Sequence, residues 1–382
     1  MKKIIFTMAM FSALFSFAQE EETPAKSFSI SGSVDAYYRA NINSFNRDYS
    51  DKGYYAPAPG SSFANDPGFA LGMANVVLNY EGEKVGAVAD LVFGPRGNDA
   101  VFNSIGSANI VNQLYVYWNV SDKVTLTFGN WNTFLGYEVI SPVDNFNYST
   151  SYMFSYGPFS HTGIKADFAL DDSWSAMLAV MNPTDWTDYN PFGTYTLGAQ
   201  LGYSVDAGSA YLNFIYGDQD GKLDSMGDSV DTYSGGSTFQ VDLTAGLDLT
   251  DTFYLGLNTT YNTTASGEYY SATGIIDDNS DDYGFYGVAL YAQLAFSDTF
   301  ALGVRPEYFS EFNGGAGAIG AYDMEGDANV FAFTLSGNVT VGDLKLIPEL
   351  RLDSASEDAF LDNDFKPQGS LGSFILAAVY SF

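Results

Sequence analysis

The sequence predicts an all-β fold: a transmembrane, antiparallel, up-and-down β-barrel of about 16 strands. Three features predict it, namely an N-terminal export signal, polar–apolar alternation over long runs, and short turns that alternate with long polar loops. The composition agrees with such a fold, because the chain of 382 residues is 46% hydrophobic and 16% aromatic.

The composition also excludes several classes of function. With 46 acidic against 15 basic residues the formal net charge is −31, and such acidity repels phosphate backbones, so we expect no nucleic-acid partner. The absence of Cys excludes disulfides, thiolate metal sites and Cys nucleophiles, and a single His leaves little room for histidine-ligated metals. We expect no cofactor.

The N-terminus has the pattern of a secretory signal peptide. Met1–Lys3 is positively charged, 4–17 is apolar, and Ser16-Phe17-Ala18 is a small-x-small cleavage site. The apolar run is shorter than the roughly 20 residues that a spanning helix needs, although a membrane anchor is the alternative. An exported chain without a helical span is periplasmic, secreted or a β-barrel of an outer membrane. Given the periodicity described next, we expect residues 1–18 to be removed, 19–27 to form a short periplasmic segment, and 28–382 to form an outer-membrane barrel.

Hydrophobic alternation with period two recurs along the mature chain. From 28 to 42 the even positions are apolar or Gly, apart from the amphipathic Tyr38, and the odd positions are mostly polar. The pattern returns over 239–249 and 344–353. Strands of soluble sandwiches are usually about 5–6 residues long, whereas a tilted membrane-crossing strand needs about 9–11. The long runs therefore predict membrane-crossing strands.

The connections between these runs are of two kinds. Seven tight turns rich in Asp, Gly and Ser occur at 81–84, 121–123, 171–173, 205–208, 250–251, 297–298 and 342–343. Eight long polar loops lie near 43–68, 95–109, 133–160, 183–194, 217–236, 265–282, 311–328 and 354–370. This alternation implies sixteen strands, with the turns on the periplasmic side and the loops outside the cell. A compact soluble domain rarely carries so many long loops.

The predicted outer surface has features that suit a bilayer. The chain ends on an apolar and aromatic stripe of alternate residues that finishes at Phe382, which resembles the signal that outer-membrane barrels present to their assembly machinery. We therefore expect that machinery and outer-membrane lipid as partners. Aromatic rings beside the turns predict interfacial girdles. They are Trp118, Phe128, Trp174, Tyr203, Phe253, Phe296 and Phe300.

A barrel of sixteen strands encloses an aqueous channel. The side chains at the inward-facing positions of the alternation are therefore predicted to line it. Arg39, Arg305 and Arg351 fall on the first, thirteenth and fifteenth strands, which form one arc once the barrel closes. The third long loop, 134–160, is unusually apolar, so we expect it to fold inward and narrow the pore. The candidate constriction residues are Glu138, Asp144, Tyr137, Tyr152, Arg39, Lys165, Arg305, Arg351, Glu307 and Glu349.

Two interpretations of these charges remain open. Glu138 and Asp144 on the loop could face the arginine arc and create a transverse field that orders polar solutes. Alternatively, the arginines pair with Glu307 and Glu349 and brace the wall.

The later loops are strongly acidic, and they would concentrate cations at the outer mouth. The densest run holds Asp277, Asp278, Asp281 and Asp282, a weak candidate for a divalent-metal site, although solvated carboxylates are the usual role of such a run. The pair Ser160–His161 makes a poor catalytic dyad, because neighbouring residues on a strand point to opposite faces. We expect no enzymatic activity.

Several motifs resemble one known family. Gly32-Ser-Val-Asp-Ala-Tyr-Tyr38, Val85-Gly-Ala-Val-Ala-Asp-Leu91 and Gln113-Leu-Tyr-Val116 carry the resemblance, together with the third loop and its flanks from Gly136 to Lys165. These segments look like the putative β-barrel porin-2 (OmpL-like) proteins of Gram-negative outer membranes. The resemblance covers nearly all the mature chain, and it implies a pore without naming a solute.

The sequence leaves three functional hypotheses. The first is a porin that passes small polar solutes and ions by diffusion, with a cation bias from its acidic mouth and the third loop as its constriction. The second is a structural or interaction barrel that this loop plugs, with acidic loops that bind a partner or ions. The third is a specific uptake channel, for sugars for example, in which Tyr137 and Tyr152 stack on rings. A homo-oligomer is possible under each.

Overall fold

The computed structural model describes residues 26–221, 232–271, 274–277 and 281–382. The expected signal peptide, most of the expected periplasmic segment 19–27, and Asp278 lie outside these residues. Within them, no helix is long and apolar enough to span a bilayer.

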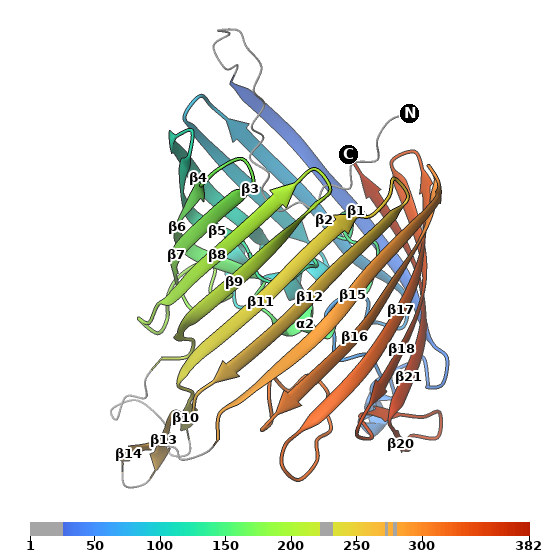
Figure 1. The fold of residues 1–382 in the computed structure, drawn as a ribbon. Coiled ribbons are helices and arrows are strands. Elements are labelled where there is room, and N and C mark those ends of the chain that lie inside the picture. Colours follow the sequence, from blue (N-terminus) through green and yellow to red (C-terminus); the bar gives the residue numbers. More distant parts are fainter. Residues whose placement is uncertain (1–25, 222–231, 272–273, 278–280) are drawn as a thin grey trace.

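Sixteen antiparallel strands form one closed barrel in which each pairs with its neighbours in chain order. This confirms the predicted up-and-down topology. Figure 1 shows the tilted strands side by side in the barrel wall. The barrel strands are β1 (Ser27–Asn41), β2 (Gly68–Glu81), β3 (Val85–Phe93), β4 (Val111–Ser121), β5 (Val124–Asn132), β6 (Ser160–Ala169), β7 (Trp174–Met181), β8 (Thr196–Val205), β9 (Gly208–Asp218), β11 (Ser237–Asp248), β12 (Phe253–Thr264), β15 (Tyr283–Ser297), β16 (Phe300–Phe312), β17 (Ala328–Val341), β18 (Leu344–Ala355) and β21 (Ser370–Ser381).

The residues that face into and out of the barrel alternate as the sequence pattern predicts. In β1 the odd positions from Ser33 to Asn41 are buried and the even positions face outward, as the alternation predicts. The strands are 8 to 15 residues long, so β7, with 8 residues, is shorter than the predicted runs. Seven short turns and eight long connections alternate, as expected. Rings beside the turns are exposed on the outer face, with Phe128 65% and Trp118 50% accessible.

The barrel closes between β1 and β21, with nine residue pairs in register. Beyond the end of β21, the backbone of Phe382 both donates to and accepts from Gly32. The C-terminal strand therefore completes the hydrogen-bonded ring, and the last ring of the chain faces outward with 59% of its surface exposed.

The long connections carry the remaining elements. Short helices occur at η1 (Ser50–Lys52), α1 (Pro95–Ala100), η2 (Gly106–Ile110) and α2 (Tyr152–Tyr156). Small sheets outside the barrel are formed by β10 (Thr232–Ser234), β13 (Glu268–Ser271) and β14 (Gly274–Asp277), and by β19 (Phe360–Leu361) and β20 (Pro367–Gln368). In Figure 1, α2 lies behind the front wall of the barrel, whereas β13 and β14 extend beyond its rim.

Strand parity yields a test of the membrane-facing surface. Leu178 of β7 faces outward with 60% exposure, and Gln200 of β8 faces the lumen at a similar height, since it pairs with Met177. Leu178→Arg should cost about 2–4 kcal/mol of stability, because a cation near the bilayer midplane is poorly solvated. Gln200→Arg is the matched control and should be tolerated. Unfolding of the protein in lipid bilayers would measure both, and equal costs would contradict the assignment.

Candidate functional site

The third long connection, residues 133–159, lies inside the barrel and packs against its wall. Phe134 and Leu135 contact a cluster on β4 to β9, and Ile140 packs with residues of β2 and β3. Further along, the loop packs against β15 to β17 and against the β18, β21 and β1 walls. These contacts bury the apolar side chains of the loop, whose number led to the prediction that it folds inward. The buried residues are Phe134, Leu135, Ile140, Phe146, Tyr148, Tyr152, Met153, Phe154 and Phe159.

Two wall glutamates hold the loop by its backbone. Glu349 of β18 accepts hydrogen bonds from the backbone N–H groups of Tyr148 (2.7 Å) and Ser149 (3.1 Å). Glu307 of β16 accepts from the N–H groups of Tyr152 (3.0 Å) and Met153 (2.9 Å). Each carboxylate thus satisfies two consecutive amides, including the first two of α2. Both glutamates are 1% exposed, so water cannot replace these bonds.

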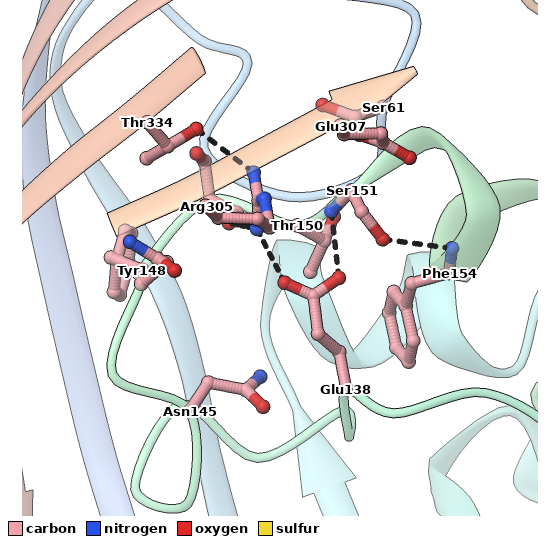
Figure 2. Close-up of polar contacts among 12 residues, drawn as sticks. Ser61, Glu138, Asn145, Tyr148, Thr150, Ser151, Phe154, Arg305, Glu307 and Thr334 are labelled. Carbon is pink, nitrogen blue, oxygen red and sulfur yellow. Dashed lines mark hydrogen bonds and ion pairs between the residues drawn. The ribbon is translucent and has the colours of Figure 1, made fainter. Parts of the chain in front are cut away.

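Two wall arginines bind the carbonyl groups of the same segment. Arg305 donates to the carbonyl of Ser149 at 2.6 Å, and Arg351 donates to that of Thr150 at 2.6 Å. Arg305 also forms an ion pair with Glu138, whose other oxygen accepts from the N–H of Ser151 at 2.7 Å (Figure 2). The wall therefore binds both the N–H and the C=O groups of this segment.

The local sequence suits this geometry. Ser151 is the N-cap of α2, and its hydroxyl accepts from the N–H of Phe154 at 3.1 Å, a bond that Figure 2 shows. A serine cap followed by a single helical turn exposes successive N–H groups to one side. Glu307 lies on that side.

The structure bears differently on the two open interpretations of the charges. Glu138 faces the arginine arc, as expected, and forms a buried ion pair with Arg305, while the transverse field itself stays a prediction. The bracing alternative is wrong in its partners: among the described residues Glu307 and Glu349 accept hydrogen bonds from loop amides, while Arg351 pairs with Asp353 on its own strand at 2.9 Å. The reason is that an inward loop brings many peptide groups that need partners.

The remaining predicted residues lie in different places. Asp144 lies near Lys345 of β18, which donates to the carbonyl of Val143, and not near the arginine arc. Lys165 pairs with Asp167 two residues along β6 at 2.8 Å.

The two candidate stacking rings are already occupied. Tyr137 stacks on Tyr291 at 3.9 Å between centroids, and its hydroxyl donates to that of Tyr254 at 2.7 Å. Tyr152 is 1% exposed and stacks on Phe309 at 5.5 Å. Tyr152 is therefore buried too deeply to stack on a sugar ring, and one face of the Tyr137 ring is occupied by Tyr291.

Arg39 serves another loop. Its guanidinium donates to the carbonyls of Asn65 at 3.0 Å and Pro57 at 3.1 Å, both in the connection 42–67. That connection also enters the barrel, where the N–H of Gly60 donates to the hydroxyl of Tyr152. Arg39 therefore holds the first loop, 42–67, where it contacts the third loop inside the barrel.

Sequence reasoning missed Arg96. This residue of α1 donates to the carbonyls of Ile140 (3.3 Å) and Tyr148 (3.1 Å), and its guanidinium lies against the rings of Tyr148 and Phe63. It thus joins three loops. Strand parity cannot place a loop residue, and the only available signal was a basic side chain alone in a connection, 94–110, that otherwise carries no base.

The acidic run and the single His form no site in the described structure. Asp281 and Asp282 are exposed, and no group of three or more His, Asp or Glu is placed to hold a metal within the described residues. His161 is fully buried, and its Nε2 lies 3.0 Å from the Thr133 hydroxyl, whereas the hydroxyl of Ser160 is 3.5 Å from that of Thr187.

The end of the third loop is held by Asp185 from the connection 182–195. Its carboxylate accepts from the N–H groups of Phe159 (2.7 Å) and Ser160 (2.9 Å), and its own N–H donates to the carbonyl of Ser160. Burial of this carboxylate raises the pKa of Asp185 to about 6. Its backbone φ of 66° is left-handed, a conformation that Asn also tolerates.

The Arg305–Glu138 pair predicts a large mutational effect. Arg305→Met should cost about 3–5 kcal/mol, because it leaves Glu138 charged and buried without its partner. The double variant R305M/E138Q should recover part of this loss, since the amide oxygen still accepts from Ser151. Denaturant unfolding would measure both. Asp364→Ala breaks an exposed pair with Lys366 and should change nothing measurable; a similar effect of R305M would contradict the prediction.

Asp185 predicts a dependence of stability on pH. Because its folded pKa lies above the ordinary value near 3.9, the stability from its protonation is complete below about pH 4 and is lost as the pH rises through 6. Asp185→Asn keeps the acceptor oxygen without the charge. Its stability relative to wild type should therefore be higher at pH 7.5 than at pH 4.5. Unfolding midpoints at the two pH values check this, and an unchanged difference would rule it out.

Comparisons with known proteins agree with the fold. Among solved structures, an anion-selective porin from Comamonas acidovorans superposes with a TM-score of 0.59 at 12% identity, over 94% of this chain and 100% of that one. The outer membrane channel DcaP of Acinetobacter baumannii gives 0.56 at 14% identity, over 96% and 100%. OmpT of Vibrio cholerae, in its trimer form, gives 0.54 at 12% identity, over 94% and 100%. These identities show a shared fold.

A search of curated proteins finds no match. The family model described as "Putative beta-barrel porin-2, OmpL-like" matches residues 27–382, which is the whole barrel. The sixteen-stranded barrel, its inward third loop and this match lead to one conclusion: the chain belongs to the beta-barrel porin-2, OmpL-like family of outer-membrane porins.

Proposed function

We propose that this outer-membrane porin passes small polar solutes and ions by passive diffusion, with a preference for cations, and that residues 134–160 form its constriction. One observation carries the proposal: a loop that crosses the lumen is fastened to the wall by buried polar groups, so it narrows the barrel at a fixed place. A narrowed aqueous pore selects by size and charge and needs no energy source.

The preference for cations rests on the excess of acidic side chains in the interior. Asp90 of β3 accepts from three amide groups, those of Asn75, Asn112 and Gln113, and from no cation. In the described part of the chain it forms no ion pair. The interior acids are Asp35, Asp90, Glu138, Asp144, Asp167, Asp242, Glu307, Glu311, Glu349 and Asp353, and the bases are Arg39, Arg96, Lys165, Arg305, Lys345 and Arg351.

Asp242 of β11 repeats this arrangement nearly opposite in the ring of strands. It accepts from Asn213 (3.1 Å), Asn258 (2.6 Å) and the N–H of Gly136. A carboxylate that only neutral groups solvate keeps its charge uncompensated, and its field reaches into the pore. This favours cations, in contrast to the Comamonas acidovorans neighbour, which is an anion-selective porin.

The close packing of the loop also favours a second candidate, a barrel that the loop seals, with acidic surface loops that bind a partner or ions. Its contacts extend around the wall from β2 to β21. A homo-oligomer remains part of the proposal, and the Vibrio cholerae neighbour has a trimer form.

Recording from the folded mature protein in a planar bilayer under a KCl gradient tests the proposal. We expect steady, ohmic steps and a reversal potential of cation sign. Asp90→Asn should shift the reversal potential toward zero at all salt concentrations, since it removes an interior charge that water screens poorly.

The matched control is Asp281→Asn, which removes an exposed acid at the outer mouth. Its effect should fade at high salt, because exposed charges are screened there. Silence from folded protein would reject diffusion and favour the sealed barrel, and a reversal potential of anion sign would reject the cation preference.

A further inference from the structure

Four glycines of the barrel wall lie directly beneath large side chains of the third loop. Gly198, Gly256, Gly287 and Gly303 belong to β8, β12, β15 and β16, and all four are buried on the inner face. The loop residues that lie on them are Phe134, Tyr137, Met153 and Phe146, in the same order.

The fit leaves no room for a methyl group. A Cβ at position 256 would lie 2.7 Å from the Tyr137 ring, and one at 287 would lie 2.8 Å from Met153. A Cβ at 198 would lie 2.9 Å from both Phe134 and Met181 of β7, and one at 303 would overlap the Phe146 ring. Real Cβ contacts are essentially never this short, so a methyl group at any of these positions forces a neighbouring side chain to move.

Glycine inside a strand needs such a reason, because it costs about 0.5–1 kcal/mol relative to Ala. Other inner glycines are covered by the wall itself: Tyr211 of β9 lies on Gly202 of β8, and Tyr117 of β4 lies on Gly86 of β3. Gly256, Gly287 and Gly303 are therefore distinguished by the third loop that covers them, whereas Gly198 is covered both by this loop and by Met181 of the wall.

From this fit we infer that Gly198, Gly256, Gly287 and Gly303 are positioning residues that set where the loop sits across the lumen, and so set the free cross-section of the pore. We call them the loop sockets. They act on the arc from β8 to β16, whereas Glu307, Glu349 and the arginines hold the backbone on β16 to β18. Fixed on both sides, the loop is a permanent partition and not a mobile gate. This inference deepens the proposed function. Only its statement about the width of the pore rests on that function, and its statement about the position of the loop does not.

Gly303→Ala and Gly256→Ala test the sockets. The added methyl should displace Phe146 or Tyr137 and unseat the loop from the wall. We expect a higher single-channel conductance than wild type. Amide hydrogen exchange within 134–160 of the folded protein, measured by mass spectrometry, needs no open pore and should become faster, because a displaced loop exposes its backbone N–H groups to water.

Two further variants separate loop positioning from a general packing defect. Gly202→Ala creates the same kind of clash within the wall, against the Ser175 hydroxyl of β7 and 2.9 Å from the Tyr211 ring, and should change neither readout. In the Gly303→Ala background, Phe146→Val removes the δ and ε ring carbons that the new methyl overlaps, and should restore wild-type conductance and hydrogen-exchange protection.

Conductance and loop accessibility can each contradict the role of the sockets. Socket variants that match wild type and G202A in both readouts would overturn it, as would a failure of Phe146→Val to reverse Gly303→Ala. If the wild-type barrel is silent, the proposed diffusion function fails, but the sockets still predict faster hydrogen exchange and the appearance of conductance in G303A. If G303A does not fold, Phe146→Ala, which empties the socket from the loop side, must give the same changes.

Discussion

The structure depends on how an irregular loop satisfies its peptide groups inside the barrel. A buried N–H or C=O group without a partner costs about 1–3 kcal/mol, and residues 148–153 bring many of them into the lumen at once. Glu307 and Glu349 solve this by accepting two consecutive N–H groups each, and Arg305 and Arg351 bind the carbonyls between. A carboxylate has two oxygens and a guanidinium has five N–H donors, so these side chains match the spacing of peptide groups.

The same constraint explains why so many charges are buried here. Each would be costly alone, but Arg305 has Glu138, Arg351 has Asp353, and the loop backbone supplies the remaining partners. Arg39 and Arg96 extend the arrangement to the first and second loops by binding their carbonyls or those of the third. Three connections that are distant in sequence therefore form one interior body.

The lumen charges differ in their partners. Arg305 and Arg351 bind the loop and are also paired with Glu138 and Asp353, so these pairs contribute little net field. Asp90 and Asp242 accept hydrogen bonds from side-chain amides and, for Asp242, from the N–H of Gly136. In the proposed function these two carboxylates favour cations, and the packing of the loop side chains against the wall sets the width of the pore.

The sequence by itself determined the barrel, because alternation, turn spacing and strand parity are local properties of the chain. It correctly placed Arg39, Arg305 and Arg351 on the inner face of one arc, and apolar content alone singled out the third loop. Only the tertiary structure decided which groups meet: Arg96 belongs to a loop without periodicity, and Asp144 lies by Lys345 instead of the arc. Contacts inside the lumen join residues as far apart as Glu349 and Ser149, which are 200 positions from each other, and no local pattern encodes such a distance.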